Sequence, residues 1–172
     1  MGRLTLITGG AASGKSTHAL RIAAQHGAHI LFVATCLPRD DEMQAKVERH
    51  RRERPASWTT VEASRHLGSA LAPGFDAAVV DCLTLLVSQL LVDELPDSDI
   101  LAEVDSLCRA ARAVDYPVLL VTGEVGQGIV PEHALARRFR ELAGRANQLA
   151  ATQADEVELL VSGIAVRIKH AG

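Results

Sequence analysis

Residues 9–16 read GGAASGKS and match the pattern G-x-x-x-x-G-K-[ST] of a phosphate-binding loop. Glycine allows backbone N–H groups to curl around phosphate oxygens, because no Cβ obstructs their approach. In such a loop the lysine, here Lys15, reaches the β- and γ-phosphates, and the hydroxyl of Ser16 binds Mg²⁺. We therefore predict that Lys15 is catalytic and that the whole loop binds nucleotide: Gly9, Gly10, Ala11, Ala12, Ser13, Gly14, Lys15 and Ser16.

Asp81 is a candidate second ligand for this metal ion. It ends the apolar run AAVVD, where a carboxylate can bind Mg²⁺ through water, opposite Ser16. A different interpretation stays open, since an aspartate after an apolar strand can also cap the next helix, and Thr84 lies close behind it.

A strongly basic stretch between Lys46 and Pro55 surrounds a single histidine, His50. Arginines suit phosphate because their planar guanidinium groups donate two hydrogen bonds side by side. Basic neighbours oppose protonation of His50, and a neutral imidazole can attack phosphorus whereas a protonated one cannot. The alternative is an ordinary solvated helix end, where cations are also favoured.

A loop rich in glycine, Thr122 to Pro131, follows another apolar run. Ligands of open parallel sheets bind outside the carboxyl ends of the strands, so Glu124 is well placed for a polar ligand. His18, close to the phosphate-binding loop, is either another contact or a helix-surface residue. Polar side chains on the helix after the glycine loop either join this site or form an ordinary amphipathic surface: Arg137, Arg138, Arg140, Arg145, Asn147 and Gln148.

These residues must be positioned by strands that alternate with helices. The sequence predicts strands at 4–8, 29–35, 58–61, 77–81, 117–122 and 156–162, an edge strand at 165–168, and helices at 14–25, 40–54, 64–71, 83–92, 100–114 and 133–152. Continuously apolar strands indicate a mostly parallel sheet covered on both faces. We expect one α/β domain over residues 1–172, a P-loop NTPase (RecA-like) three-layer sandwich with a C-terminal edge strand.

Composition narrows the classes of function. The chain has 172 residues, of which 48% are hydrophobic and 3% aromatic, and its net charge is −3. The small net charge gives no strong attraction to the phosphates of a nucleic acid, and few aromatic side chains are present to stack on its bases. The composition therefore argues against a nucleic-acid-binding protein. Cys36, Cys82 and Cys108 form no paired motif, which favours a reduced, cytoplasmic compartment. Apolar runs are too short for a membrane span.

Taken together, the motifs resemble a known family from Leu6 to Lys169. This is the bifunctional adenosylcobinamide kinase / adenosylcobinamide-phosphate guanylyltransferase family of cobalamin biosynthesis. The joint presence of the His50 stretch and of EVGQGIVP, residues 124–131, is more specific than a phosphate-binding loop alone. The sequence departs from the family at Ala12, commonly arginine there, and at Asp81, often glutamate.

The resemblance implies two reactions and a set of residues. A nucleoside triphosphate, ATP or GTP, phosphorylates the aminopropanol hydroxyl of adenosylcobinamide; GTP then guanylylates a histidine that matches His50, and GMP passes on to give adenosylcobinamide-GDP. It also implies a homotrimer. The implied nucleotide contacts beyond the phosphate-binding loop are Ala34, Thr35, Cys36, Arg51, Arg52, Glu53, Arg54, Glu62 and Asp81.

Two other functions fit the phosphate-binding loop. One is a monofunctional P-loop kinase of a small molecule, with His50 structural. The other is a nucleotide-dependent binding switch that has no phosphoryl acceptor. Covalent labelling by α-labelled GTP distinguishes the bifunctional enzyme from both.

Overall fold

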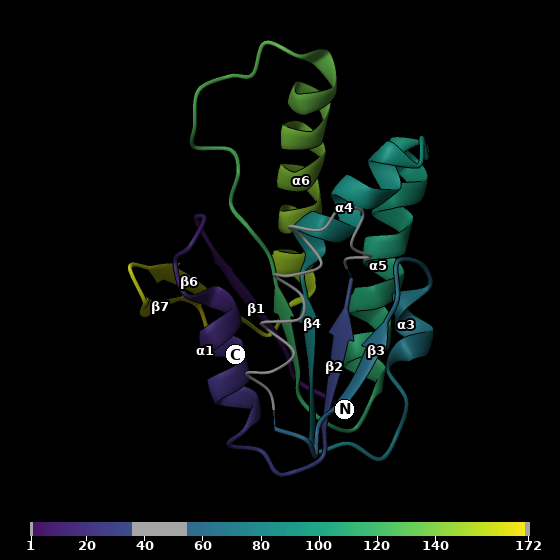
Figure 1. Ribbon diagram of the computed structural model, residues 1–172, viewed down its shortest axis with the longest axis vertical. Helices are drawn as coiled ribbons and strands as arrows, with labels where there is room; N and C mark the ends of the chain where they lie inside the picture. The colour runs from purple at the N-terminus through teal and green to yellow at the C-terminus, as the bar shows by residue number, and fades with distance from the viewer. Residues whose placement is uncertain (1, 36–54, 171–172) are drawn as a thin grey trace.

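A seven-stranded sheet organises the part of the chain that the computed structural model describes, residues 2–35 and 55–170 (Figure 1). Its strands lie in the order β3-β2-β4-β5-β1-β6-β7, with β7 antiparallel to β6 and the other neighbours parallel. The strands are β1 (Leu4–Gly9), β2 (Ile30–Ala34), β3 (Thr59–Glu62), β4 (Ala77–Asp81), β5 (Val118–Val121), β6 (Glu156–Val161) and β7 (Ile164–Lys169).

Helices cover both faces of this sheet. The apolar side of α1 (Lys15–Ala23) packs on one face through Ala19 and Ala23. On the other face lie α3 (Leu67–Ala70), α4 (Leu83–Val92), α5 (Asp97–Ala113) and α6 (Ala134–Gln153), grouped on the far side of the sheet from α1 in Figure 1. The three layers and the mostly parallel sheet confirm the expected architecture, while the helix expected over 40–54 lies outside the described residues.

The continuously apolar strands are buried on both faces, as the pattern predicted. All five residues of β2 and all four of β5 are buried, which suits strands in the middle of a parallel sheet. Two helices start three residues away from their expected positions: α3 spans only Leu67–Ala70 of the expected 64–71, and α5 begins at Asp97 rather than at residue 100. Pro96 precedes it, and Asp97 and Asp99 stand in its first turn, where acidic side chains favour the helix dipole.

No helix in the described ranges 2–35 and 55–170 is long and apolar enough to cross a membrane.

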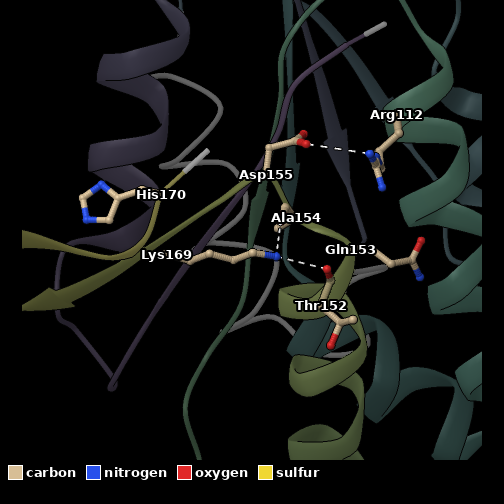
Figure 2. A pocket seen from close by; sticks show the side chains of 7 residues that line it. All are labelled: Arg112, Thr152, Gln153, Ala154, Asp155, Lys169 and His170. Atoms are coloured by element: carbon tan, nitrogen blue, oxygen red, sulfur yellow. Dashed lines mark hydrogen bonds and ion pairs between the residues drawn. The ribbon is translucent and has the colours of Figure 1, made fainter. Parts of the chain in front are cut away.

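Figure 2 shows a polar cavity lined by residues that include Arg112, Asp155 and Lys169. It lies at the amino ends of β1 and β6, whereas the phosphate-binding loop follows the carboxyl end of β1. Lys169 lines this cavity, and its ammonium donates to the carbonyls of Ala151, Thr152 and Ala154, at 2.9, 3.0 and 2.5 Å. A helix leaves its last carbonyls without partners, and a cation there also favours the dipole. Lys169 therefore joins the end of α6 to the edge strand β7.

Replacing this cation should weaken the fold. We expect Lys169→Met to lower the free energy of unfolding by about 1–2 kcal/mol, because the carbonyls at the end of α6 lose a charged donor. Arg109→Met, which removes only an exposed i,i+4 ion pair with Asp105, should change it by less than about 0.5 kcal/mol. Urea unfolding of both variants measures the difference, and equal small effects would contradict the role given to Lys169.

Candidate nucleotide-binding site

The phosphate-binding loop joins the carboxyl end of β1 to the start of α1, as predicted. Two glycines determine its path. A Cβ on Gly9 would lie 2.5 Å from the carbonyl oxygen of Leu160 and 2.8 Å from Ser13 Oγ, and Gly14 precedes α1 with a φ of +93°. Both positions therefore exclude ordinary side chains, and the backbone of the loop curves tightly onto the first turn of α1.

Lys15 lies over this loop. Its Nζ donates to the carbonyl of Gly10 at 2.5 Å and lies 3.4 Å from Ser13 Oγ. Burial lowers the pKa of Lys15, while the nearby Cys82 and Asp81 act in the opposite direction. The ammonium is thus partly withdrawn from water, beside the backbone of the loop and within the electrostatic field of Asp81.

Three of the predicted nucleotide contacts form one row across the sheet. Ala34 of β2 pairs with Glu62 of β3 on one side and with Asp81 of β4 on the other. Asp81 pairs in turn with Val121 of β5, which pairs with Ile7 of β1, two residues before the loop begins. The structure therefore brings Glu62, Ala34 and Asp81 to the same edge as the phosphate-binding loop.

Thr35 is fully buried, and its hydroxyl is occupied within the protein. Oγ1 donates to the carbonyl of Cys82 at 2.7 Å and accepts from its N–H at 2.8 Å, while Thr35 N donates to the carbonyl of Asp81 at 3.2 Å. The Asp81–Cys82 peptide is cis. The side chain of Thr35 thus holds the strand end that carries Asp81, a role that its sequence position alone did not indicate.

His18 is also occupied within the protein. Arg21 Nη2 lies 3.1 Å from its Nδ1, and its Nε2 lies 2.7 Å from a carboxylate oxygen of Glu158. A guanidinium only donates, so Nδ1 accepts and the ring proton on Nε2 points to Glu158. Both ring nitrogens have partners, and His18 fastens α1 to β6.

The arginines of α6 fasten the glycine loop and neighbouring elements. Arg138 and Arg145 pair with Asp97 at 2.6 and 4.0 Å, Arg137 donates to the carbonyls of Pro131 and Glu132, and Arg140 donates to that of Gly126. Of the two interpretations from sequence, these contacts favour the structural one. The carboxylate of Glu124 accepts from Gly126 N at 2.8 Å and so shapes the same loop.

One contact of the phosphate-binding loop was missed from sequence. Gly163, in the turn between β6 and β7, donates its N–H to the carbonyl of Ser13 at 2.9 Å. The glycine after an apolar strand signalled a turn, but its place beside the loop depends on β6 pairing with β1.

The remaining predicted residues lie outside the described part of the chain: Cys36, His50, Arg51, Arg52, Glu53 and Arg54. Within the described part, no group of three or more histidine, cysteine, aspartate or glutamate side chains is arranged to hold a metal ion. The expected metal site is of another kind, since Ser16 and Asp81 would supply two hard oxygen donors and a nucleotide the others.

An apolar strand, a glycine loop, a lysine over that loop and a mostly parallel sheet define a P-loop NTPase of the RecA-like class. The RadB recombinase has a similar fold, with a TM-score of 0.57 at 18% identity, over 98% of this chain and 81% of that chain. That similarity concerns the fold alone.

The chain belongs to the cobinamide kinase / cobinamide phosphate guanyltransferase family, whose model matches residues 5–168. It is 43% identical to the bifunctional adenosylcobalamin biosynthesis protein CobU of Escherichia coli (strain K12), over 96% of this chain and 99% of that protein. Its identity to CobU of Salmonella typhimurium is also 43%, with the same coverage. The chain is therefore a bifunctional enzyme of cobalamin biosynthesis, a kinase and a guanylyltransferase, as the resemblance implied.

The surroundings of Cys82 predict an inert thiol. Burial and the adjacent Asp81 raise the pKa of Cys82 to about 12, so the reactive thiolate is scarce at pH 8. We expect iodoacetamide at pH 8 to leave Cys82 unmodified in the native protein and to modify it in urea, as read by mass spectrometry of peptides. Rapid modification of Cys82 in the native protein would contradict this environment.

Proposed function

We propose that the edge formed by the phosphate-binding loop, Asp81 and Glu62 is the nucleotide site of both reactions. The observation that carries this proposal is the position of Lys15, held over the loop and close to Asp81. The phosphates lie on the loop, where backbone N–H groups and the start of α1 favour negative charge. The nucleoside extends along the row of Asp81, Ala34 and Glu62.

In the kinase step the aminopropanol hydroxyl of adenosylcobinamide attacks the γ-phosphorus of ATP or GTP. The bond from that phosphorus to the bridging oxygen breaks, the nucleoside diphosphate leaves, and the proton of the hydroxyl is released to solvent. Lys15 offsets the negative charge that gathers on the transferring phosphoryl group. Cobinamide phosphate is then the acceptor for the second reaction.

In the guanylyltransferase step His50 is the nucleophile. A neutral imidazole nitrogen attacks the α-phosphorus of GTP, a phosphoramidate forms, and pyrophosphate leaves. The phosphate of the cobinamide then displaces the imidazole and takes up GMP. The covalent intermediate divides one difficult transfer into two easier displacements. Arg51, Arg52 and Arg54, beside His50 in the sequence, would offset charge at the α-phosphate.

Ser16 and Asp81 are the residues that would hold Mg²⁺. Asp81 ends β4 and Ser16 stands in the first turn of α1, and both offer the oxygen donors that this cation prefers. When bound, Mg²⁺ neutralises charge on the phosphates.

The assembly is proposed to be a homotrimer in the cytoplasm, where nucleoside triphosphates are supplied. The family resemblance supports the trimer. Exposed apolar side chains on the last hairpin, Val161, Ile164, Val166 and Ile168, offer a surface that a neighbouring subunit would cover. Light scattering coupled to size-exclusion chromatography measures the assembly, and a monomer at micromolar concentration would contradict it.

Removing the lysine tests the shared nucleotide site. We expect Lys15→Ala to lower kcat/KM of both half-reactions by about a hundredfold or more, because a phosphate clamp is lost while no core volume changes. Circular dichroism should show a folded variant, and Arg109→Met is the matched control on the surface. Normal kinase turnover by folded Lys15→Ala would remove the loop from the mechanism.

Replacing the histidine separates the two activities. His50→Asn should stop covalent attachment of GMP from α-labelled GTP and leave the kinase step largely intact, since that step needs no histidine adduct. Gel autoradiography detects the label, and turnover of adenosylcobinamide measures the kinase. The label should be lost in mild acid and kept in alkali, because protonation of the nitrogen helps a phosphoramidate to break.

The matched control is His26→Asn, which alters an exposed histidine just after the carboxyl end of α1 and should keep full labelling. Labelling that persists in His50→Asn would show that another residue is the nucleophile. Loss of both activities by a folded His50→Asn would instead make His50 part of the shared nucleotide site.

A further inference from the structure

A closed ring of hydrogen bonds lies at the carboxyl end of β5. It joins Thr84 of α4, Thr122 at the end of β5, Asn147 of α6 and the backbone of Gly123. Gly123 N donates to Thr84 Oγ1 at 2.5 Å, Thr84 Oγ1 lies 3.2 Å from Thr122 Oγ1, Thr122 Oγ1 donates to Asn147 Oδ1 at 2.6 Å, and Asn147 Nδ2 donates to the carbonyl of Gly123 at 3.1 Å. Thr122 is fully buried.

The direction of every bond in this ring is fixed. The carbonyl of Gly123 only accepts, so the amide nitrogen of Asn147 must face it, and the amide oxygen then faces Thr122. Thr122 must therefore donate its one proton to Asn147, and Thr84 must donate to Thr122. All bonds run the same way around the ring, an arrangement in which each bond polarises the next.

The ring is connected both to the strand end that carries Asp81 and to the phosphate-binding loop. Thr84 stands three residues after Asp81, in the first turn of α4. Thr122 N donates to the carbonyl of Ile7 in β1 at 2.9 Å. The backbone N–H of Glu124, the residue after Gly123, donates to the carbonyl of Gly9, also at 2.9 Å. Thr84 therefore bonds to the Thr122–Gly123 peptide, and the first glycine of the phosphate-binding loop bonds to the next peptide, Gly123–Glu124. The strand end that carries Asp81 and the loop are thus tied to the two peptide groups that flank Gly123.

We propose that Thr122 and Asn147 are positioning residues of the kinase reaction, which fix the phosphate-binding loop relative to Asp81. The proposal rests on the nucleotide site described above. Neither side chain touches the reacting atoms; both act through the two peptide groups that flank Gly123. Phosphoryl transfer depends on placement more than on covalent chemistry by the protein, so a small displacement between the lysine of the loop and Asp81 slows the transfer itself.

A positioning role and a purely structural role in the core predict different effects of Thr122 substitutions on the kinase activity. Removing one buried hydroxyl leaves its partners unsatisfied and costs stability. In a cluster that serves packing alone, that loss does not slow turnover by the variant that stays folded. For positioning, Thr122→Val breaks the ring at two bonds although it keeps the shape, whereas Thr122→Ser retains the hydroxyl and loses only a methyl group. The activity should therefore follow the hydroxyl and not the volume.

The experiment compares these variants in the kinase half-reaction, with full-length protein and at a temperature where circular dichroism shows each to be folded. We expect Thr122→Val to lower kcat by about tenfold or more, with a much smaller change in KM for the nucleotide, and Thr122→Ser to keep kcat close to that of the parent. The matched control is Thr152→Val, which removes an exposed hydroxyl that donates to the carbonyl of Gln148 in the same helix and should leave kcat unchanged.

Asn147→Asp gives a second break in the ring. It is isosteric and still accepts from Thr122, but it cannot donate to the carbonyl of Gly123, so kcat should fall as in Thr122→Val. The proposal is overturned if folded Thr122→Val or folded Asn147→Asp turns over normally, or if Thr122→Ser is as slow as Thr122→Val. Lys15→Ala, assayed in parallel, distinguishes a failure of the proposed nucleotide site from a failure of the positioning role. If Lys15→Ala keeps its activity, the nucleotide site itself is contradicted. If Lys15→Ala is inactive while Thr122→Val is active, only the positioning role is contradicted.

Discussion

The close approach of Gly9 to β6 and to Ser13 is the constraint on which this site depends. The backbone turns there so tightly that a single added carbon would lie 2.5 Å from the Leu160 carbonyl. Because β1 is flanked by β5 and β6, the loop after it is held from both sides, by Glu124 at Gly9 and by Gly163 at Ser13. The loop is thereby shaped by its neighbours in the sheet before any phosphate arrives, which lowers the cost of ordering it on binding.

Polar side chains at the carboxyl edge of the sheet divide into two groups. The first group stabilises the edge through hydrogen bonds within the protein. Thr35 bonds to the Cys82 backbone, and Thr84, Thr122 and Asn147 form a ring of hydrogen bonds with the backbone of Gly123. Their hydrogen-bonding capacity is used within the protein, as buried polar groups require. The second group, Lys15, Ser16 and Asp81, is the one that we assign to the phosphates and Mg²⁺. Phosphoryl transfer needs both groups, because a charged side chain stabilises the transition state only when the surrounding hydrogen bonds hold it in the correct position.

Much of this arrangement could be predicted from sequence. Continuous apolar strands predicted the parallel sheet, and GGAASGKS between a strand and a helix predicted the loop, because both signals are local. The use made of Thr35, Asn147 and the arginines of α6 could not be predicted, since it depends on which strand ends become neighbours. The hydroxyl of Thr35 bonds to the backbone of Cys82, a partner that its place in the sequence does not indicate, and its contact with a nucleotide stays a prediction. The predictions for Cys36 and for His50 to Arg54 concern residues outside the described ranges and stay predictions.

The central claim is that the loop holds the nucleotide phosphates through Lys15. A crystal structure with Mg²⁺ and a non-hydrolysable GTP analogue tests it most directly. The account predicts that Lys15 Nζ leaves the Gly10 carbonyl, to which it donates at 2.5 Å, and lies about 3 Å from a phosphate oxygen, with the Thr84–Thr122–Asn147 ring unchanged. A structure in which Lys15 keeps the Gly10 carbonyl while the phosphates bind away from residues 9–16 would contradict it.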